Sequence, residues 1–162
     1  MKVETVDALR QALARGESQL IEKIDVDGEG VAQVAELIGA APDGAFERLE
    51  YLVLVRGGLE RLPDKLGRCT QLSALVIWGN RLSDLPDLSA LAKLSYVHAS
   101  DNRFTQIPDA LSGLPSLSEL NLHNNPLTRL ASSPHPTVRK LDARNCGLTE
   151  LDGDLAFVPA VE

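Results

Sequence analysis

The sequence predicts an α/β fold, a right-handed solenoid in which each coil supplies one short parallel strand and one return segment. Two observations lead to this prediction. A 15-residue apolar pattern recurs in phase five times, and two segments near the N-terminus carry apolar residues at helical spacing. A single copy of such a pattern cannot bury its own leucines, so neighbouring coils must stack to form the core. With 162 residues and a hydrophobic fraction of 44%, one soluble domain over residues 1–162 accounts for the whole chain.

Residues 1–19 are expected to form an N-terminal helical cap. Thr5 suits the N-cap of a helix over residues 5–15, because its hydroxyl can accept a hydrogen bond from a free backbone N–H. Leu9, Ala12 and Leu13 fall on one face of that helix, and Gly16 ends it. The apolar face should cover the leucines of the first coil.

Residues 20–48 are predicted to form a first, longer repeat. Ile21, Ile24 and Val26 alternate as expected for a strand with one buried face, and 28 residues separate Ile21 from the next copy at Leu49. The extra length holds apolar residues at helical spacing from Val31 onward. The first coil is therefore expected to return through a helix.

Five short repeats follow over residues 49–158. They start at residues 49, 72, 94, 117 and 138, and the copy from Leu72 reads LSALVIWGNRLSDLP. An Asn ends the strand in three copies, where its amide can bond turning backbone, which predicts a structural ladder of Asn80, Asn102 and Asn125. Gly57 and Cys146 take that position in the outer copies, so the ladder should be incomplete at both ends. Prolines then forbid a second strand and favour an extended or loosely helical return at Pro63, Pro86 and Pro108.

This frame, LxxLxLxxNxLxxLP, resembles the short variant of the leucine-rich-repeat family, and the resemblance covers the chain from Ile21 onward. It implies a curved solenoid whose parallel strands line a concave face that commonly holds the ligand. Members of the family include regulators, inhibitors and host-directed effectors, so the resemblance implies binding without choosing among those roles.

The C-terminal end is less regular. The copy from Leu117 lacks the proline and continues into SSPHP at residues 132–136, expected to be an extended connection, and the last copy runs through Leu151, Leu155 and Val158 to a tail at 159–162. A terminal strand edge needs a cover. Three alternatives stay open: Phe157 and its neighbours fold over the end, the array continues in a longer protein, or two copies form a weak edge-to-edge dimer instead of a monomer.

Composition limits the partners and compartment. The net charge is -7, with ten acids and five bases in residues 1–48, which argues against nucleic acid and anionic membranes and favours a basic protein or peptide. Cys69 and Cys146 form no paired motif, so both are predicted to be reduced and buried, in a cytoplasmic protein without a signal peptide. No cofactor or metal is expected.

The functional prediction rests on side-chain direction. If positions 1, 4 and 6 of the frame point inward, positions 3, 5, 7 and 8 face solvent, and these include both tyrosines and the single tryptophan. An exposed apolar patch with Trp and Tyr is typical of an interaction site, although β propensity or cross-strand packing alone could also place such residues there. The predicted partner-binding residues on the concave face are Tyr51, Val53, Val55, Arg56, Val76, Trp78, Tyr96, His98, Asp101, Glu119 and His123.

Enzymatic chemistry is the weaker interpretation. His98, Asp101, Glu119, His123 and Asp142 should lie near one another and could bind a metal or move protons, but a solvated polar rim explains them as well. No glycine-rich phosphate loop or catalytic residue is predicted. The sequence therefore predicts a non-enzymatic protein-interaction module; the alternatives are an inhibitor, immunity or effector-type protein, or a fragment of a larger multidomain signalling protein.

Overall fold

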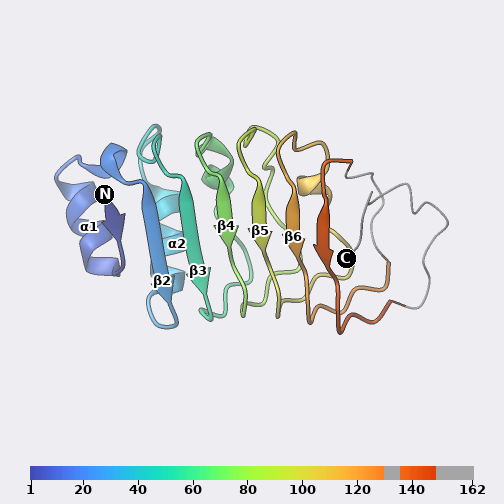
Figure 1. The fold of residues 1–162 in the computed structure, drawn as a ribbon. Helices are drawn as coiled ribbons and strands as arrows, with labels where there is room; N and C mark the ends of the chain where they lie inside the picture. Colours follow the sequence, from blue (N-terminus) through green and yellow to red (C-terminus); the bar gives the residue numbers. More distant parts are fainter. Residues whose placement is uncertain (130–135, 149–162) are drawn as a thin grey trace.

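The computed structural model describes residues 1–129 and 136–148, which form a stack of coils with one parallel sheet (Figure 1). The sheet has seven strands in sequence order, and each pairs in parallel with the next. The strands are β1 (Lys2–Val3), β2 (Lys23–Asp27), β3 (Tyr51–Val55), β4 (Ala74–Val76), β5 (Tyr96–His98), β6 (Glu119–Asn121) and β7 (Lys140–Asp142). The predicted α/β solenoid, with one short parallel strand in each coil, is confirmed.

The two predicted N-terminal helices are present. Helix α1 (Val6–Ala14) begins after Thr5, whose Oγ1 accepts a hydrogen bond from the N–H of Ala8 at 3.1 Å. Helix α2 (Val31–Ala40) returns the first coil and lies behind the sheet (Figure 1). Two later coils return through shorter 3₁₀ turns, η2 (Asp64–Arg68) and η3 (Asp109–Leu111), each preceded by a proline. A further 3₁₀ turn, η1 (Ser18–Leu20), follows α1. None of the helices in these described segments combines the length and apolar character that crossing a membrane requires.

Strand β1 was not expected from the sequence. Lys2 and Val3 pair with Lys23 and Ile24, and Val3 is buried. The α-amino group of Met1 donates to the carbonyl oxygen of Leu20 at 2.8 Å and so holds the start of the chain against the first coil. The N-terminal cap is therefore a strand and a helix together.

The core confirms the inward direction of frame positions 1, 4 and 6. Their side chains are buried in every coil up to β6: Ile21, Ile24, Val26, Leu49, Leu52, Leu54, Leu72, Leu75, Ile77, Leu94, Val97, Ala99, Leu117, Leu120 and Leu122. Two of the three phenylalanines, Phe46 and Phe104, are also buried, whereas Phe157 lies outside the described residues. The predictions for residues 132–135 and for Leu151, Leu155 and Val158 fall outside the described residues too.

The asparagine ladder is confirmed and links consecutive coils. The Nδ2 of Asn102 donates to the carbonyl oxygens of Ile77 at 3.0 Å and Ala99 at 3.2 Å, and its Oδ1 accepts from the N–H of Leu82 at 3.0 Å. Asn80 and Asn125 repeat the pattern one coil earlier and one coil later. Each buried amide thus satisfies backbone groups of its own coil and of the preceding coil.

The two exceptions in the ladder differ from each other. Cys146 keeps a weak version, because its thiol donates to the carbonyl oxygen of Leu122 at 3.5 Å, but it is only half-buried, so the prediction that both cysteines are buried is wrong for Cys146. Gly57 leaves no room for any side chain. A Cβ there would lie 2.3 Å from both Cβ and Cγ1 of Val31, the first residue of α2. A helix therefore fills the place that an asparagine takes in later coils.

Candidate functional site

The outward residues form straight rows across the sheet, because the strands pair in register. Frame position 3 gives the row Lys23, Tyr51, Ala74, Tyr96, Glu119 and Lys140, and position 5 gives Asp25, Val53, Val76, His98, Asn121 and Asp142. Neighbouring members of a row lie one strand spacing apart, about 4.8 Å. We call this surface, together with positions 7 and 8, the strand face.

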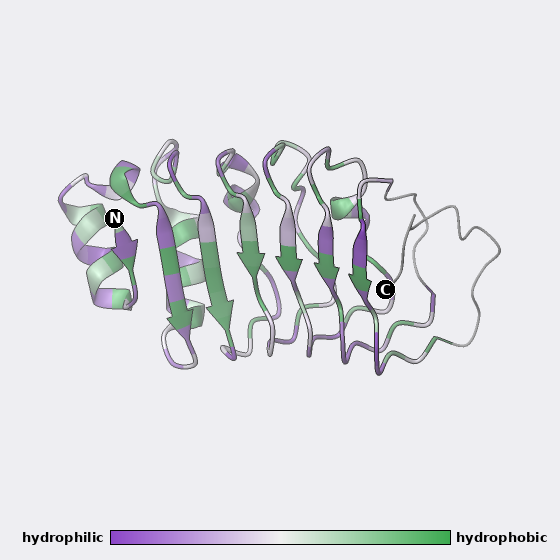
Figure 2. Cartoon of the chain, in the orientation of Figure 1, coloured by the Kyte–Doolittle hydropathy of each residue, from purple (hydrophilic) through white to green (hydrophobic). Residues whose placement is uncertain are grey.

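An apolar patch occupies the middle of the strand face. Tyr51 is 46% exposed, and Val53, Val76, Trp78 and Tyr96 are half-buried, so none of the three aromatic rings belongs to the buried core. Figure 2 shows β3 and β4 as mainly hydrophobic strands, whereas hydrophilic residues alternate on β2 and return on β6 and β7. The direction that the sequence predicted for these side chains is correct; their role in binding stays a prediction.

The prediction that Val55 faces solvent as a docking residue is wrong, because its side chain is only 4% exposed. It lies in the position-7 row between Asp27, its partner on β2, and Trp78 of the next coil. The guanidinium of Arg56 donates to both carboxylate oxygens of Asp27 and lies 5.4 Å from the centre of the Trp78 ring. One guanidinium therefore contacts both neighbours of Val55.

Arg56 adopts an unusual backbone conformation. Position 8 is left-handed in all six coils, and five of its occupants are residues that tolerate this conformation: Gly28, Gly79, Asp101, Asn124 and Asn145. Arg56 has φ +55° at the same position. A long side chain is held there against local preference, stabilised by the ion pair to Asp27 and the contact with Trp78. Both ionised forms gain from the pair, so the pKa of Asp27 is lowered and that of Arg56 is raised.

Trp78 and Tyr96 both contact the imidazole of His98. The Trp78 and His98 rings stack with centroids 6.4 Å apart and planes inclined by 29°, and the Tyr96 ring meets His98 edge-on, also at 6.4 Å. The Nε2 of His98 lies 3.0 Å from Oγ of Ser100. Burial lowers the pKa of His98 although Asp101 and Asp142 oppose the shift, so the neutral ring dominates at pH 7.

Charged residues on the strand face are arranged in pairs. Lys23 bonds Asp25 at 3.0 Å, Arg56 bonds Asp27, Lys140 bonds Glu119 at 3.1 Å and Arg144 bonds Asp142 at 2.7 Å. Asp101 has no basic partner within the described residues. Its Oδ1 accepts a hydrogen bond from Nδ2 of Asn124 at 2.8 Å.

The predicted polar group of histidines and carboxylates comes together only loosely. A positive charge on His123 would lower the pKa of His98 and that of Asp142, so these three residues lie near one another. Nδ1 of His123 is buried and has no hydrogen-bond partner among the residues that the structure describes. Within those same residues, no three side chains of His, Cys, Asp or Glu are arranged to hold a metal ion.

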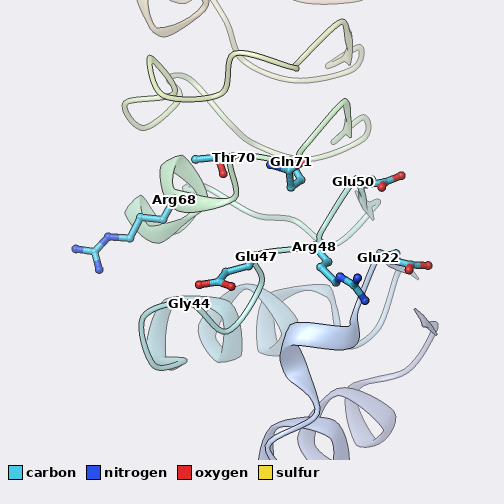
Figure 3. A pocket seen from close by; sticks show the side chains of 8 residues that line it. All are labelled: Glu22, Gly44, Glu47, Arg48, Glu50, Arg68, Thr70 and Gln71. Carbon is cyan, nitrogen blue, oxygen red and sulfur yellow. The ribbon is translucent and has the colours of Figure 1, made fainter.

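The structure also has a hollow of about 660 Å³ that the sequence did not predict (Figure 3). It lies where the return of the long first coil meets the return of the next coil, and its lining is largely polar: Glu22, Gly44, Glu47, Arg48, Glu50, Arg68, Thr70 and Gln71. Arg68 also forms an ion pair with Asp43. The 28-residue spacing of the first coil could have predicted this hollow, because a coil that returns through a helix is wider than the next coil, which returns through a 3₁₀ turn. Small-molecule sites are mostly apolar, so the strand face is the better candidate.

Comparison with known proteins agrees with this geometry. A family model described as leucine rich repeat matches residues 70–127. The receptor-like kinase TMK2 of Arabidopsis thaliana is 36% identical over 108 residues, which are 63% of this chain and 12% of the kinase. The Ras guanine nucleotide exchange factor V of Dictyostelium discoideum is 30% identical over 96 residues, 50% of this chain and 5% of that protein.

Solved structures show the same fold. InlP of Listeria monocytogenes aligns with a TM-score of 0.61 at 25% identity over 76% of this chain and 35% of that chain. A leucine-rich-repeat protein of Leptospira interrogans gives 0.60 at 19% identity, with coverage of 91% and 49%. The leucine-rich-repeat domain of APL1B gives 0.60 at 23% identity, with coverage of 91% and 40%. The chain spans less than half of each of these structures.

Proposed function

We propose that this chain, a leucine-rich-repeat protein, is a non-enzymatic module that binds a folded protein or an exposed peptide through the strand face. The observation that carries the proposal is the direction of Tyr51, Trp78 and Tyr96, which stand on the outward rows of three adjacent strands. The fold requires apolar residues only on the inward rows. Aromatic residues that the core does not use are the usual anchors of protein interfaces.

The strand face also has the border that an interface needs. Ion pairs flank the apolar patch on β2 and on β6 to β7, and an apolar centre with a polar rim is the common anatomy of a protein-binding surface. Packing on cross-strand neighbours accounts for part of the burial of Trp78 and Tyr96. It does not account for Tyr51, which remains 46% exposed.

The test compares two double variants that change different layers of the solenoid. Trp78→Ala with Tyr96→Ala removes two rings from the strand face, and Gln33→Ala with Glu36→Ala changes exposed residues of α2 behind the sheet. A protein captured by cross-linking to the native chain would be purified and its affinity measured for all three proteins. We expect the first variant to lose at least about 30-fold, the effect of one hot-spot residue of about 2 kcal/mol, and the second to change little.

Circular dichroism and thermal unfolding would establish that both variants fold. Equal affinity of the folded ring variant and the native chain would refute a binding site on the strand face. Loss of affinity in the α2 variant alone would indicate that the partner binds the helical layer behind the sheet.

A second role, as the repeat portion of a larger signalling protein, is favoured by the match to two much longer proteins, a receptor-like kinase and a guanine nucleotide exchange factor. An inhibitor, immunity or effector role would use the same strand face. The free thiols Cys69 and Cys146 suit a reducing compartment, so a cytoplasmic location is part of the proposal.

A further inference from the structure

We propose that the strand face takes a lysine or arginine side chain of its protein partner at Asp101, beside the stacked rings of Trp78 and His98. The inference rests on the proposed function and adds the chemistry of the group that is recognised. It assigns a role to one carboxylate that has no cationic partner among residues 1–129 and 136–148.

The pairing of charges on the strand face leads to Asp101. All four basic side chains of the face already have a carboxylate partner, and those four pairs use every acidic residue of the face except Asp101. Within the described residues, the side chain of Asp101 bonds only the neutral amide of Asn124, through Oδ1. The carboxylate is exposed and oriented, and its second oxygen is available to a donor from outside the chain.

The surroundings of Asp101 suit a long basic side chain. Asp101 follows Ser100, whose hydroxyl contacts the His98 ring. The N–H of Gly79, the residue after Trp78, donates to the carbonyl oxygen of Ser100 at 3.1 Å, so the coils of Trp78 and Asp101 are bonded at this point. The half-buried rings offer an apolar surface to the methylene groups of lysine or arginine. His98 is mainly neutral because burial lowers its pKa, so it does not supply the missing positive charge.

An acidic group is the poorer occupant. Arg56 is a base that lies over the Trp78 ring, and Asp27 already holds its guanidinium through two hydrogen bonds. The chain as a whole carries a net charge of -7, so its field attracts cations and repels anions. Local pairing and overall charge therefore favour the same class of partner group.

The experiment uses hexa-arginine as the probe and Trp78 as the reporter, because Trp78 is the single tryptophan of the chain. Asp101→Asn removes the charge and keeps the shape, and asparagine occupies the same left-handed position at Asn124 and Asn145, so the fold accepts it. Glu36→Gln on α2 removes an equal charge from an exposed residue behind the sheet and serves as the matched control. Titrations at physiological salt limit attraction over distances beyond about 8 Å.

We expect hexa-arginine to change the Trp78 emission with a saturating curve, and hexaglutamate to leave it unchanged. Asp101→Asn should weaken hexa-arginine binding about fivefold, the value of one exposed ion pair, and Glu36→Gln less than about twofold. Equal weakening by both variants, no response to hexa-arginine, or equal binding of hexaglutamate would overturn the proposal. Those outcomes leave the proposed function separately testable, because capture that depends on Trp78 and Tyr96 requires no basic group in the partner.

Discussion

Gly57→Ala is the most direct test of how the helical first coil meets the short repeats. The added Cβ would lie 2.3 Å from Cβ and Cγ1 of Val31, whereas carbon atoms in contact lie about 3.5–4.0 Å apart. Val31 is fully buried at the start of α2, and its Cβ is fixed to the helix backbone, so a change of rotamer cannot remove the overlap. The helix or the turn must move by more than about 1 Å.

The backbone and the packing act in opposite directions at Gly57. Its φ is not in the left-handed region, so alanine alone would stabilise the fold by about 0.4–1 kcal/mol through the unfolded state. Overpacking typically costs about 1–3 kcal/mol and more where neighbours are fixed. We expect a net loss of about 2 kcal/mol in the free energy of unfolding. The asparagine that later repeats carry would bring the same Cβ, so Gly57→Asn should also destabilise the fold.

Urea unfolding followed by circular dichroism and by Trp78 emission gives the free energy. Gly58→Ala is the matched control, because Gly58 has φ +67° and nothing within 4 Å of an added Cβ, so it should lose only about 1 kcal/mol. A Gly57→Ala protein as stable as the native chain, or more stable than Gly58→Ala, would refute the steric argument.

Three further predictions concern the ladder, the thiols and acid stability. Asn102→Ala strands the N–H of Leu82 and buried carbonyls, so urea unfolding should show a loss of about 3 kcal/mol, against less than about 0.5 kcal/mol for exposed Arg103→Ala. In the folded protein Ellman's reagent at pH 8 should modify one thiol rapidly and lose that reaction in Cys146→Ser, because burial raises the pKa of Cys69 to about 11; two fast thiols would contradict this. Bonds from Arg144 lower the pKa of Asp142 from 3.8 to about 2, so its contribution is present above pH 4 and is lost as the pH falls toward 2; Asp142→Asn should flatten that part of the acid-unfolding curve, and an unchanged curve would contradict the assignment.

Most of the fold could be predicted because the repeat constrains the same positions in each coil. An inward leucine has to meet the coil before and after it, so the frame fixes the burial of residues as distant as Leu52 and Leu120. The ladder follows equally directly, since an amide at the end of each strand has one set of backbone groups within reach. Strand β1 escaped prediction because two residues carry no period, and only the edge of β2 gives them a partner.

The candidate site was predicted less completely, because its details depend on side chains that cross between coils. The frame places Val55 outward, and the structure buries it. Its neighbours Asp27 and Trp78 are linked by Arg56, which bonds Asp27 across 29 residues of sequence. That Asp101 has no basic partner among the described residues becomes visible only when the ion pairs of the other charged residues of the strand face are known. Neither effect has a periodic signal, since each depends on one long side chain and one particular neighbour.

The left-handed backbone of Arg56 is not explained by the requirements of the fold alone. The left-handed position favours glycine, aspartate or asparagine, and a residue held there against its preference costs about 1–2 kcal/mol. An ion pair between exposed side chains, such as that with Asp27, stabilises the fold only weakly, so the pair alone does not offset the backbone strain. Residues held in a strained backbone conformation cluster at functional sites, and Arg56 contacts Trp78 of the proposed site. If Trp78 binds the proposed partner, its contact with Arg56 would lower the entropy that binding must remove from that ring.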